Sequence, residues 1–207
     1  MGNLIYSIGY SSYAISDFVK AIVAYGIDVI ADVRSQPYSR YKPEYNRENL
    51  KQTLKQNGIA YVFLGDQCGA RIQAPECYVN GKVSFELVKR NKDFQTGLQR
   101  LRKGMQTHRI AIMCAERDPI NCHRAILICR NLRAHDVVIN HIVDNGLLEN
   151  HVDTEKRLIR IHGLEKALLY PTETERLDEA YRLQSEAIAY VELTQNEEKG
   201  DRETMNA

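Results

Sequence analysis

The sequence has little net charge, no long apolar run and an odd number of cysteines. A formal net charge of +1 over 207 residues means that any affinity for nucleic acid or phosphate must come from local patches. No apolar run approaches the roughly 18 residues of a membrane span, and the first residues lack the pattern of a secretory leader, which predicts a cytoplasmic protein without a membrane partner. Five cysteines argue against a secreted disulfide framework.

Short apolar runs alternate with helical patterns through most of the chain. Five runs rich in β-branched residues predict strands at 4–8, 27–33, 59–64, 109–113 and 137–143. Four segments with apolar residues at helical spacing lie at 16–26, 46–57, 93–104 and 125–134. Because parallel neighbours need crossover connections, this alternation predicts an α/β fold. Its form is a three-layer domain over residues 1–150, with a mostly parallel five-stranded sheet flanked by helices.

The C-terminal part predicts a helical extension over residues 151–194. Thr172 and Glu175 have the spacing of a capping box, and the apolar residues behind them repeat at helical period: Leu177, Tyr181, Ala187, Ile188 and Val191. The stripe is expected to cover the domain's own flank, with a homodimer contact as the alternative. Residues 195–207 are polar and are expected to be disordered.

Polar residues gather directly after four of the five predicted strands. Ligands of open parallel sheets bind outside the carboxyl ends of the strands, so these residues are expected to share one pocket. The first strand is followed by Gly9, Tyr10 and Ser11; the second by Asp32, Arg34, Ser35, Ser39 and Arg40; the third by Gly65 and Asp66; the fourth by Cys114, Glu116, Arg117, Cys122, His123 and Arg124; and the last, more weakly, by Asp144 and Gly146.

The residue types after these strands predict a site for a phosphate-bearing ligand. A helix start at Cys122–Arg124 offers unpaired backbone N–H groups to an anion. Contacts to the ligand are assigned to six residues: Arg34, Arg40, Arg124, Gly9, Ser11 and Tyr38. Cys122 beside His123 is placed where a thiol pKa falls, and Asp32 and Glu116 suit general acid–base work. The prediction is an enzyme, a hydrolase or a transferase acting on a nucleotide or nucleic-acid component.

Simpler interpretations stand beside these roles. Asp32 and Arg34 are equally consistent with a structural ion pair, and Cys114 at a strand end is typical of a core residue. Cys114, Glu116, Cys122 and His123 hold ligand atoms but match no standard zinc spacing such as CxxC, so no metal is predicted and no cofactor is assigned.

The segment 37–47, PYSRYKPEYNR, supports an alternative function. Its three tyrosines alternate with the cations Arg40, Lys42 and Arg47, and aromatics set among cations are typical of single-strand nucleic-acid surfaces. A non-catalytic nucleic-acid-binding module is therefore the second hypothesis.

Four segments resemble the bacterial family catalogued as domain of unknown function 488. They are SIGYSS, ADVRSQPYSR, Arg90-Asn91 followed by Phe94, and MCAERDPINCHR, and the resemblance spans about residues 3–146. Tyr10 stands where that family usually has histidine, and residues 66–69 replace a double glycine. The resemblance implies a fold and a site but no reaction. A looser similarity to rhodanese-type domains, through IADVRS and IAIMCAE, makes sulfur transfer by Cys114 the third hypothesis.

Overall fold

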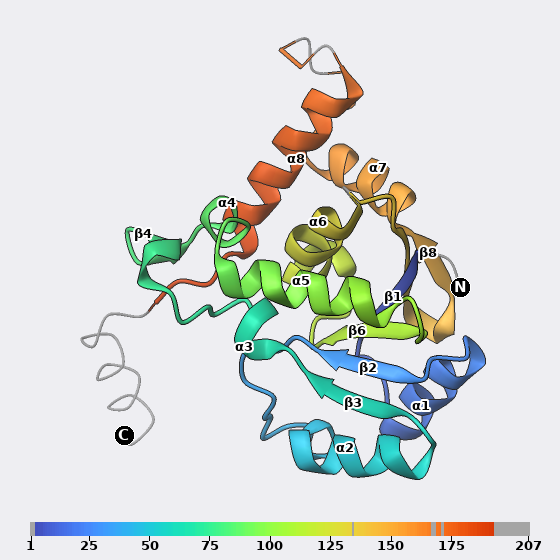
Figure 1. Cartoon of the computed structure of the whole chain (residues 1–207). Helices are drawn as coiled ribbons and strands as arrows, with labels where there is room; N and C mark the ends of the chain where they lie inside the picture. Colours follow the sequence, from blue (N-terminus) through green and yellow to red (C-terminus); the bar gives the residue numbers. More distant parts are fainter. Residues whose placement is uncertain (1–2, 134, 167–168, 171, 193–207) are drawn as a thin grey trace, which may run out of the picture.

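A six-stranded sheet forms the centre of the fold (Figure 1). The computed structural model describes residues 3–133, 135–166, 169–170 and 172–192. Five strands are parallel, in the order β3-β2-β6-β1-β7, and β8 pairs antiparallel with β7 at the edge. Their bounds are β1 Leu4–Gly9, β2 Val29–Asp32, β3 Ala60–Phe63, β6 Ile110–Cys114, β7 Val138–Ile142 and β8 Leu148–Asn150. The mostly parallel sheet is confirmed; the count of five is corrected to six, because three-residue β8 is too short to show a strand period.

Helices cover both faces of the sheet, which confirms the three-layer α/β arrangement (Figure 1). One face carries α1 (Ile15–Ala24) and α2 (Arg47–Gln56), whose apolar residues Phe18, Ile22, Leu50 and Leu54 are fully buried. The other face carries α5 Lys92–Gly104, a π-helical segment Arg124–Cys129 continued by α6 Arg130–Arg133, α7 His151–Ile161 and α8 Glu173–Ile188.

Short elements fill the remaining connections. The irregular stretch after β3 contains α3 (Gly65–Cys68), the two-stranded hairpin of β4 (Tyr78–Val79) and β5 (Lys82–Val83), and α4 (Phe85–Val88). Single 3₁₀ turns lie at Pro43–Tyr45, Pro75–Cys77, Pro119–Asn121 and Asp144–Gly146.

The C-terminal helix packs on its own chain. The expected capping box is present, because Thr172 accepts from the Glu175 N–H and the Glu175 carboxylate accepts from the Thr172 N–H. Ala180 and Tyr181 are buried in the same core as Leu158 of α7, so that core continues past residue 150. The stripe is thus used within the chain, and the homodimer contact stays a prediction. Residues 195–207 lie outside the described residues. Within the described ranges, none of the helices is long and apolar enough to cross a membrane.

The chain leaves β1 and β6 toward opposite faces of the sheet. α1 follows β1 on one face, whereas the π-helical segment follows β6 on the other. These two strands are hydrogen-bonded neighbours, with Gly9 paired to Cys114 at their carboxyl ends. Open α/β sheets bind ligands near such a switch point.

Candidate functional site at the ends of β1, β2 and β6

The end of β2 is occupied by a buried ion pair. Arg34 donates through Nε to Asp32 Oδ1 at 2.9 Å and through Nη2 to Asp32 Oδ2 at 2.6 Å, and both side chains are buried. Arg34 Nη2 also donates to the Tyr45 carbonyl, and the Tyr61 hydroxyl donates to Asp32. Nη1 has no hydrogen-bond partner among the residues that the structure describes, but the guanidinium lies 5.0 Å from the centroid of the Tyr10 ring. The structural interpretation of Asp32 and Arg34 is the one the geometry supports.

Four side chains meet at the end of β6, and we call them the thiol cluster: Cys114, Glu116, Cys122 and His123. Glu116 Oε2 lies 3.0 Å from both sulfur atoms. His123 Nδ1 lies 3.8 Å from Cys114 Sγ and 3.9 Å from Cys122 Sγ. The two cysteines are 3% and 1% exposed, respectively, while Glu116 is exposed at the surface with its carboxylate turned to the thiols.

A tight return of the chain after β6 brings the two cysteines together. Asp118 accepts from the Ile120 N–H and opens a 3₁₀ turn with proline at its first position, which sends the backbone back toward the strand end. Gly9 permits this return, because a Cβ atom there would lie 1.8 Å from the Glu116 carbonyl oxygen. Gly9 is therefore needed for close packing of the β6 loop.

Arg124 holds the same loop from inside. Its fully buried guanidinium donates to the Glu116 carbonyl at 2.6 Å and the Arg117 carbonyl at 3.0 Å, and its Nε donates to Ser7 Oγ at 3.3 Å. The Arg124 backbone N–H points at Cys122 Sγ at 3.5 Å. The Arg124 backbone N–H, which was expected to bind an anion at this helix start, therefore contacts the sulfur of Cys122 instead.

The environments of the two thiols move their pKa values in opposite directions. Burial disfavours the Cys122 thiolate, but the hydrogen bond from Cys114 and the charges of Arg124 and His123 outweigh it and lower the Cys122 pKa well below its ordinary value. The hydrogen bond to Cys122, together with burial, raises the pKa of Cys114. Burial and the nearby Cys122 charge raise the pKa of Glu116. Cys114 therefore stays a thiol, which disfavours it as the sulfur-transferring residue.

The orientation of His123 is set by a backbone carbonyl. His123 Nε2 lies 3.1 Å from the Val33 oxygen, which can only accept, so Nε2 carries the proton. Burial opposes protonation of the ring, but the contact with Cys122 outweighs it and raises the pKa of His123. In the neutral ring the lone pair of Nδ1 faces the two sulfur atoms.

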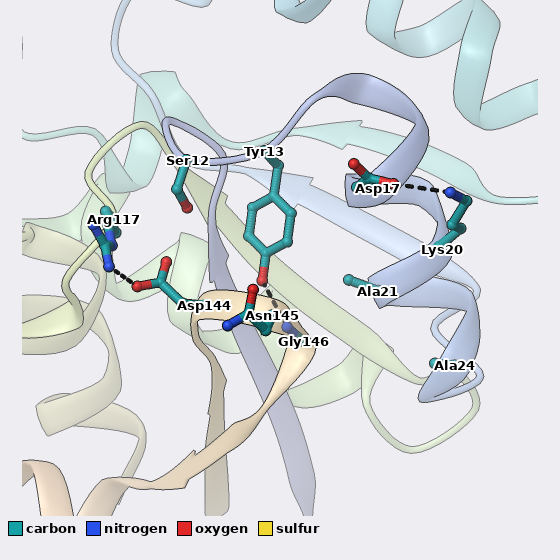
Figure 2. Close-up of a pocket in the computed structure, with 10 residues that line it drawn as sticks. All are labelled: Ser12, Tyr13, Asp17, Lys20, Ala21, Ala24, Arg117, Asp144, Asn145 and Gly146. Carbon is teal, nitrogen blue, oxygen red and sulfur yellow. Dashed lines mark hydrogen bonds and ion pairs between the residues drawn. The ribbon is translucent and has the colours of Figure 1, made fainter.

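Two cavities meet at Arg117, the residue that follows Glu116 of the cluster. The first, of about 680 Å³, lies between α1 and the β7 end and is lined by Ser12, Tyr13, Asp17, Lys20, Arg117 and Asp144 among others (Figure 2). The second, of about 660 Å³, is lined by Glu116 together with Arg117, Asp118, Asn121, Asp144 and Arg157 among others. The ion pair of Arg117 and Asp144 lies on the border between them (Figure 2).

The predicted site residues divide into two groups. Cys122, His123 and Glu116 converge with Cys114; Asp32 and Arg34 lie on the adjacent strand, and the Val33 carbonyl between them holds His123. Tyr38 and Arg40 instead lie exposed between β2 and α2, where the Tyr38 hydroxyl donates to Glu48. Ser11 is exposed, and its N–H bonds the Ala115 carbonyl.

Sequence reasoning found only part of the cavity lining. Arg117 and Asp144 follow β6 and β7 at the same sheet edge, and the strand-end rule pointed to both but gave neither a contact to the ligand. Lys20 of α1 and Tyr13 just before that helix carried no signal, because the side of a helix that faces a cavity depends on how the helix packs.

An open α/β sheet, covered on both faces and carrying a cluster of thiol, carboxylate and imidazole groups at its switch point, defines the class of this protein. The family described as domain of unknown function DUF488 matches residues 14–130, more than half of the chain, so the chain belongs to this family. The matched range contains all four members of the thiol cluster but not Gly9. No curated protein and no solved structure shows significant similarity to the chain.

Proposed function

We propose that this protein is an enzyme, a hydrolase or a transferase, acting on a phosphate-bearing ligand such as a nucleotide, and that the thiol cluster is its reaction centre. One observation carries the proposal: Glu116 is exposed on the second cavity while its carboxylate contacts two buried thiols. A ligand in that cavity can therefore reach Glu116 directly and the sulfur atoms only behind it. We assign to Glu116 the exchange of a proton with the ligand. Cys122 and His123, which lie behind Glu116, are assigned as the reactive charged pair.

The charges of the two cavities decide where a phosphate fits. Four carboxylates and two arginines line the second cavity, and this excess of negative charge opposes an anion there. The first cavity balances Asp17 and Asp144 with Lys20 and Arg117. Arg117, with its side chain 65% exposed, borders both cavities, so it is assigned the phosphate contact. Arg34 and Arg124 donate to protein groups and are assigned to positioning.

Turnover of a nucleotide panel tests the proposal. The full chain is incubated with ATP, AMP and p-nitrophenyl phosphate, and products are resolved by chromatography. Glu116→Gln is expected to lower turnover by about 10²- to 10⁴-fold, the usual contribution of a general acid or base. Cys122→Ser is expected to do the same, whereas Cys129→Ser, a buried cysteine outside the cluster, keeps the wild-type rate. Arg117→Ala is expected to raise KM more than it lowers kcat. No turnover of any compound, or full turnover by folded Glu116→Gln, contradicts the proposal.

The second candidate is a nucleic-acid-binding module, favoured by the exposure of two tyrosines. Tyr41 is 96% exposed and Tyr38 is 59% exposed, whereas Tyr45 is buried against Tyr10 and unable to stack on a base. Binding of a fluorescent single-stranded oligonucleotide is expected to weaken steeply between 50 and 200 mM salt, and to weaken further in Tyr41→Ala. Binding that ignores both changes removes this candidate.

A further inference from the structure

The four donor groups of the thiol cluster point at one small volume. One ligand atom from each of Cys114, Glu116, Cys122 and His123 lies within 4.8 Å of the other three. We propose that these four side chains bind a single Zn²⁺ ion. Two thiolates, an imidazole and a carboxylate are all ordinary zinc ligands, and four of them complete its preferred coordination number.

Four of the six distances between the donor atoms are close to those of a tetrahedral ion. Bonds of about 2.3 Å to sulfur and about 2.0–2.1 Å to nitrogen or oxygen place the donors of a tetrahedron about 3.3–3.8 Å apart. The two sulfur-to-imidazole distances, 3.8 and 3.9 Å, lie at the upper limit of this range and just above it. Each sulfur lies 3.0 Å from the Glu116 oxygen, so the carboxylate has to retreat by about half an ångström to meet the donor spacing of a tetrahedron. Glu116 lines the second cavity, which gives its side chain room for that shift.

The surroundings of His123 are those of a metal ligand. Metal-binding histidines donate their second ring N–H to a carbonyl or carboxylate, which fixes the tautomer and the ring plane. His123 Nε2 meets the Val33 carbonyl in this way, and Nδ1 faces the two sulfurs. Val33 immediately follows β2, so the neighbouring strand orients the ligand.

The charges around the cluster are compatible with such an ion. Arg124 is fully buried, and among the ion pairs of the described residues it has no carboxylate partner, unlike Arg34. In the metal-free protein its counter-charge is the Cys122 thiolate, whose sulfur also accepts from the Arg124 backbone N–H. Zinc with two thiolates and one carboxylate carries a net charge of −1, which the Arg124 guanidinium balances. Binding releases the thiol proton of Cys114 to solvent and needs the neutral form of His123.

The site also has an entry path. Three ligands are buried, and the fourth, Glu116, borders the cavity of about 660 Å³. An exposed fourth ligand that can exchange for a water or substrate oxygen is the arrangement of catalytic rather than structural zinc. The role of the ion as a cofactor of the reaction rests on the proposed function, and in that role Cys122 is a metal ligand. The binding site itself rests on geometry alone.

Metal content and cobalt spectroscopy test the inference. The full chain is reduced, freed of metal with a chelator and titrated with Zn²⁺ or Co²⁺ under reducing conditions. We expect one Zn²⁺ per chain and a Co²⁺ complex with the intense visible bands of tetrahedral coordination and a sulfur charge-transfer band. Cys114→Ser and Cys122→Ser are expected to weaken binding by at least about 100-fold, and Cys129→Ser to leave it unchanged. Glu116→Gln keeps the protein folded, because Glu116 is exposed, and shifts the visible bands.

The outcomes separate this inference from the proposed function. No stoichiometric zinc, or zinc retained by a Cys114→Ser Cys122→Ser double variant, overturns the metal site. If turnover is nevertheless lost in Glu116→Gln, the enzyme proposal survives without a metal. Stoichiometric zinc in a chain that turns over none of the tested phosphates supports the site and removes the function.

Discussion

The neighbouring strands β2 and β6 both end in buried polar groups, yet only the groups at the end of β2 form an ion pair with each other. At β2, the two oxygens of Asp32 accept from the fork of Arg34, and the remaining contacts come from Tyr45 and Tyr61. At β6, a carboxylate, two sulfurs and an imidazole lone pair face one another. The first end is closed by an ion pair, whereas the second brings four side chains together that can each coordinate a metal.

This difference separates polar groups that stabilise the fold from polar groups that are available for binding or chemistry. A matched pair gains most from its own partner and is expected to serve the fold. A group of four metal-ligating side chains gains most from a cation. The β2 end therefore predicts large stability effects, and the β6 end predicts large effects on ligand and metal binding.

Removing one partner of the ion pair is expected to have the largest effect on stability. Arg34→Ala leaves Asp32 charged and buried, and the free energy of unfolding is expected to fall by about 3–5 kcal/mol. Urea denaturation measures it, with exposed Arg40→Ala as the matched control, expected within about 0.5 kcal/mol of wild type. A loss below 1 kcal/mol for Arg34→Ala would break the comparison.

Loading the cluster with metal is expected to have the next largest effect. At a free Zn²⁺ concentration 100 times Kd, the free energy of unfolding is expected to rise by about 2.7 kcal/mol. Cys122→Ser should lose this gain and Arg40→Ala should keep it. Equal stabilisation of wild type and Cys122→Ser, in thermal melts with and without chelator, would show that zinc acts elsewhere.

A buried histidine pair extends the comparison to neutral groups. His141 Nδ1 lies 2.6 Å from Ser7 Oγ, and His141 Nε2 lies 2.8 Å from His151 Nδ1. Burial, with the neighbouring positive charge of Arg133, lowers the pKa of His151 to about 3, and burial also lowers that of His141. The unfolded chain binds these protons at a higher pH than the folded chain does. The contribution of the histidine pair to stability is therefore complete above pH 6.5 and is lost as the pH falls toward 3.

The expected loss is at most about 1.4 kcal/mol per pH unit for each histidine. Urea denaturation between pH 7.5 and 5 measures it. His151→Gln should flatten the slope, while the exposed His108→Gln should leave it unchanged. A wild-type slope of zero, or an equal slope in His151→Gln, would exclude the neutral pair as the cause.

Periodicity and strand-end chemistry predicted much of this molecule, and their failures have physical reasons. The alternation of short apolar runs and helices gave the layers, and the rule for strand ends gave the convergence of Cys122, His123 and Glu116. The partners of Arg124 could not be predicted from the sequence, because they are carbonyl oxygens whose positions depend on the backbone. The four-donor geometry was missed because ligand spacing along the chain was used as the criterion, whereas a turn brings Cys114 and Cys122 together.

Zinc-edge X-ray absorption of the zinc-loaded full chain tests most directly whether the β6 end is an incomplete centre. Two sulfur neighbours at about 2.3 Å and two nitrogen or oxygen neighbours at about 2.0–2.1 Å are expected. A first shell without sulfur would contradict the assignment of the zinc ion to the thiol cluster at the end of β6.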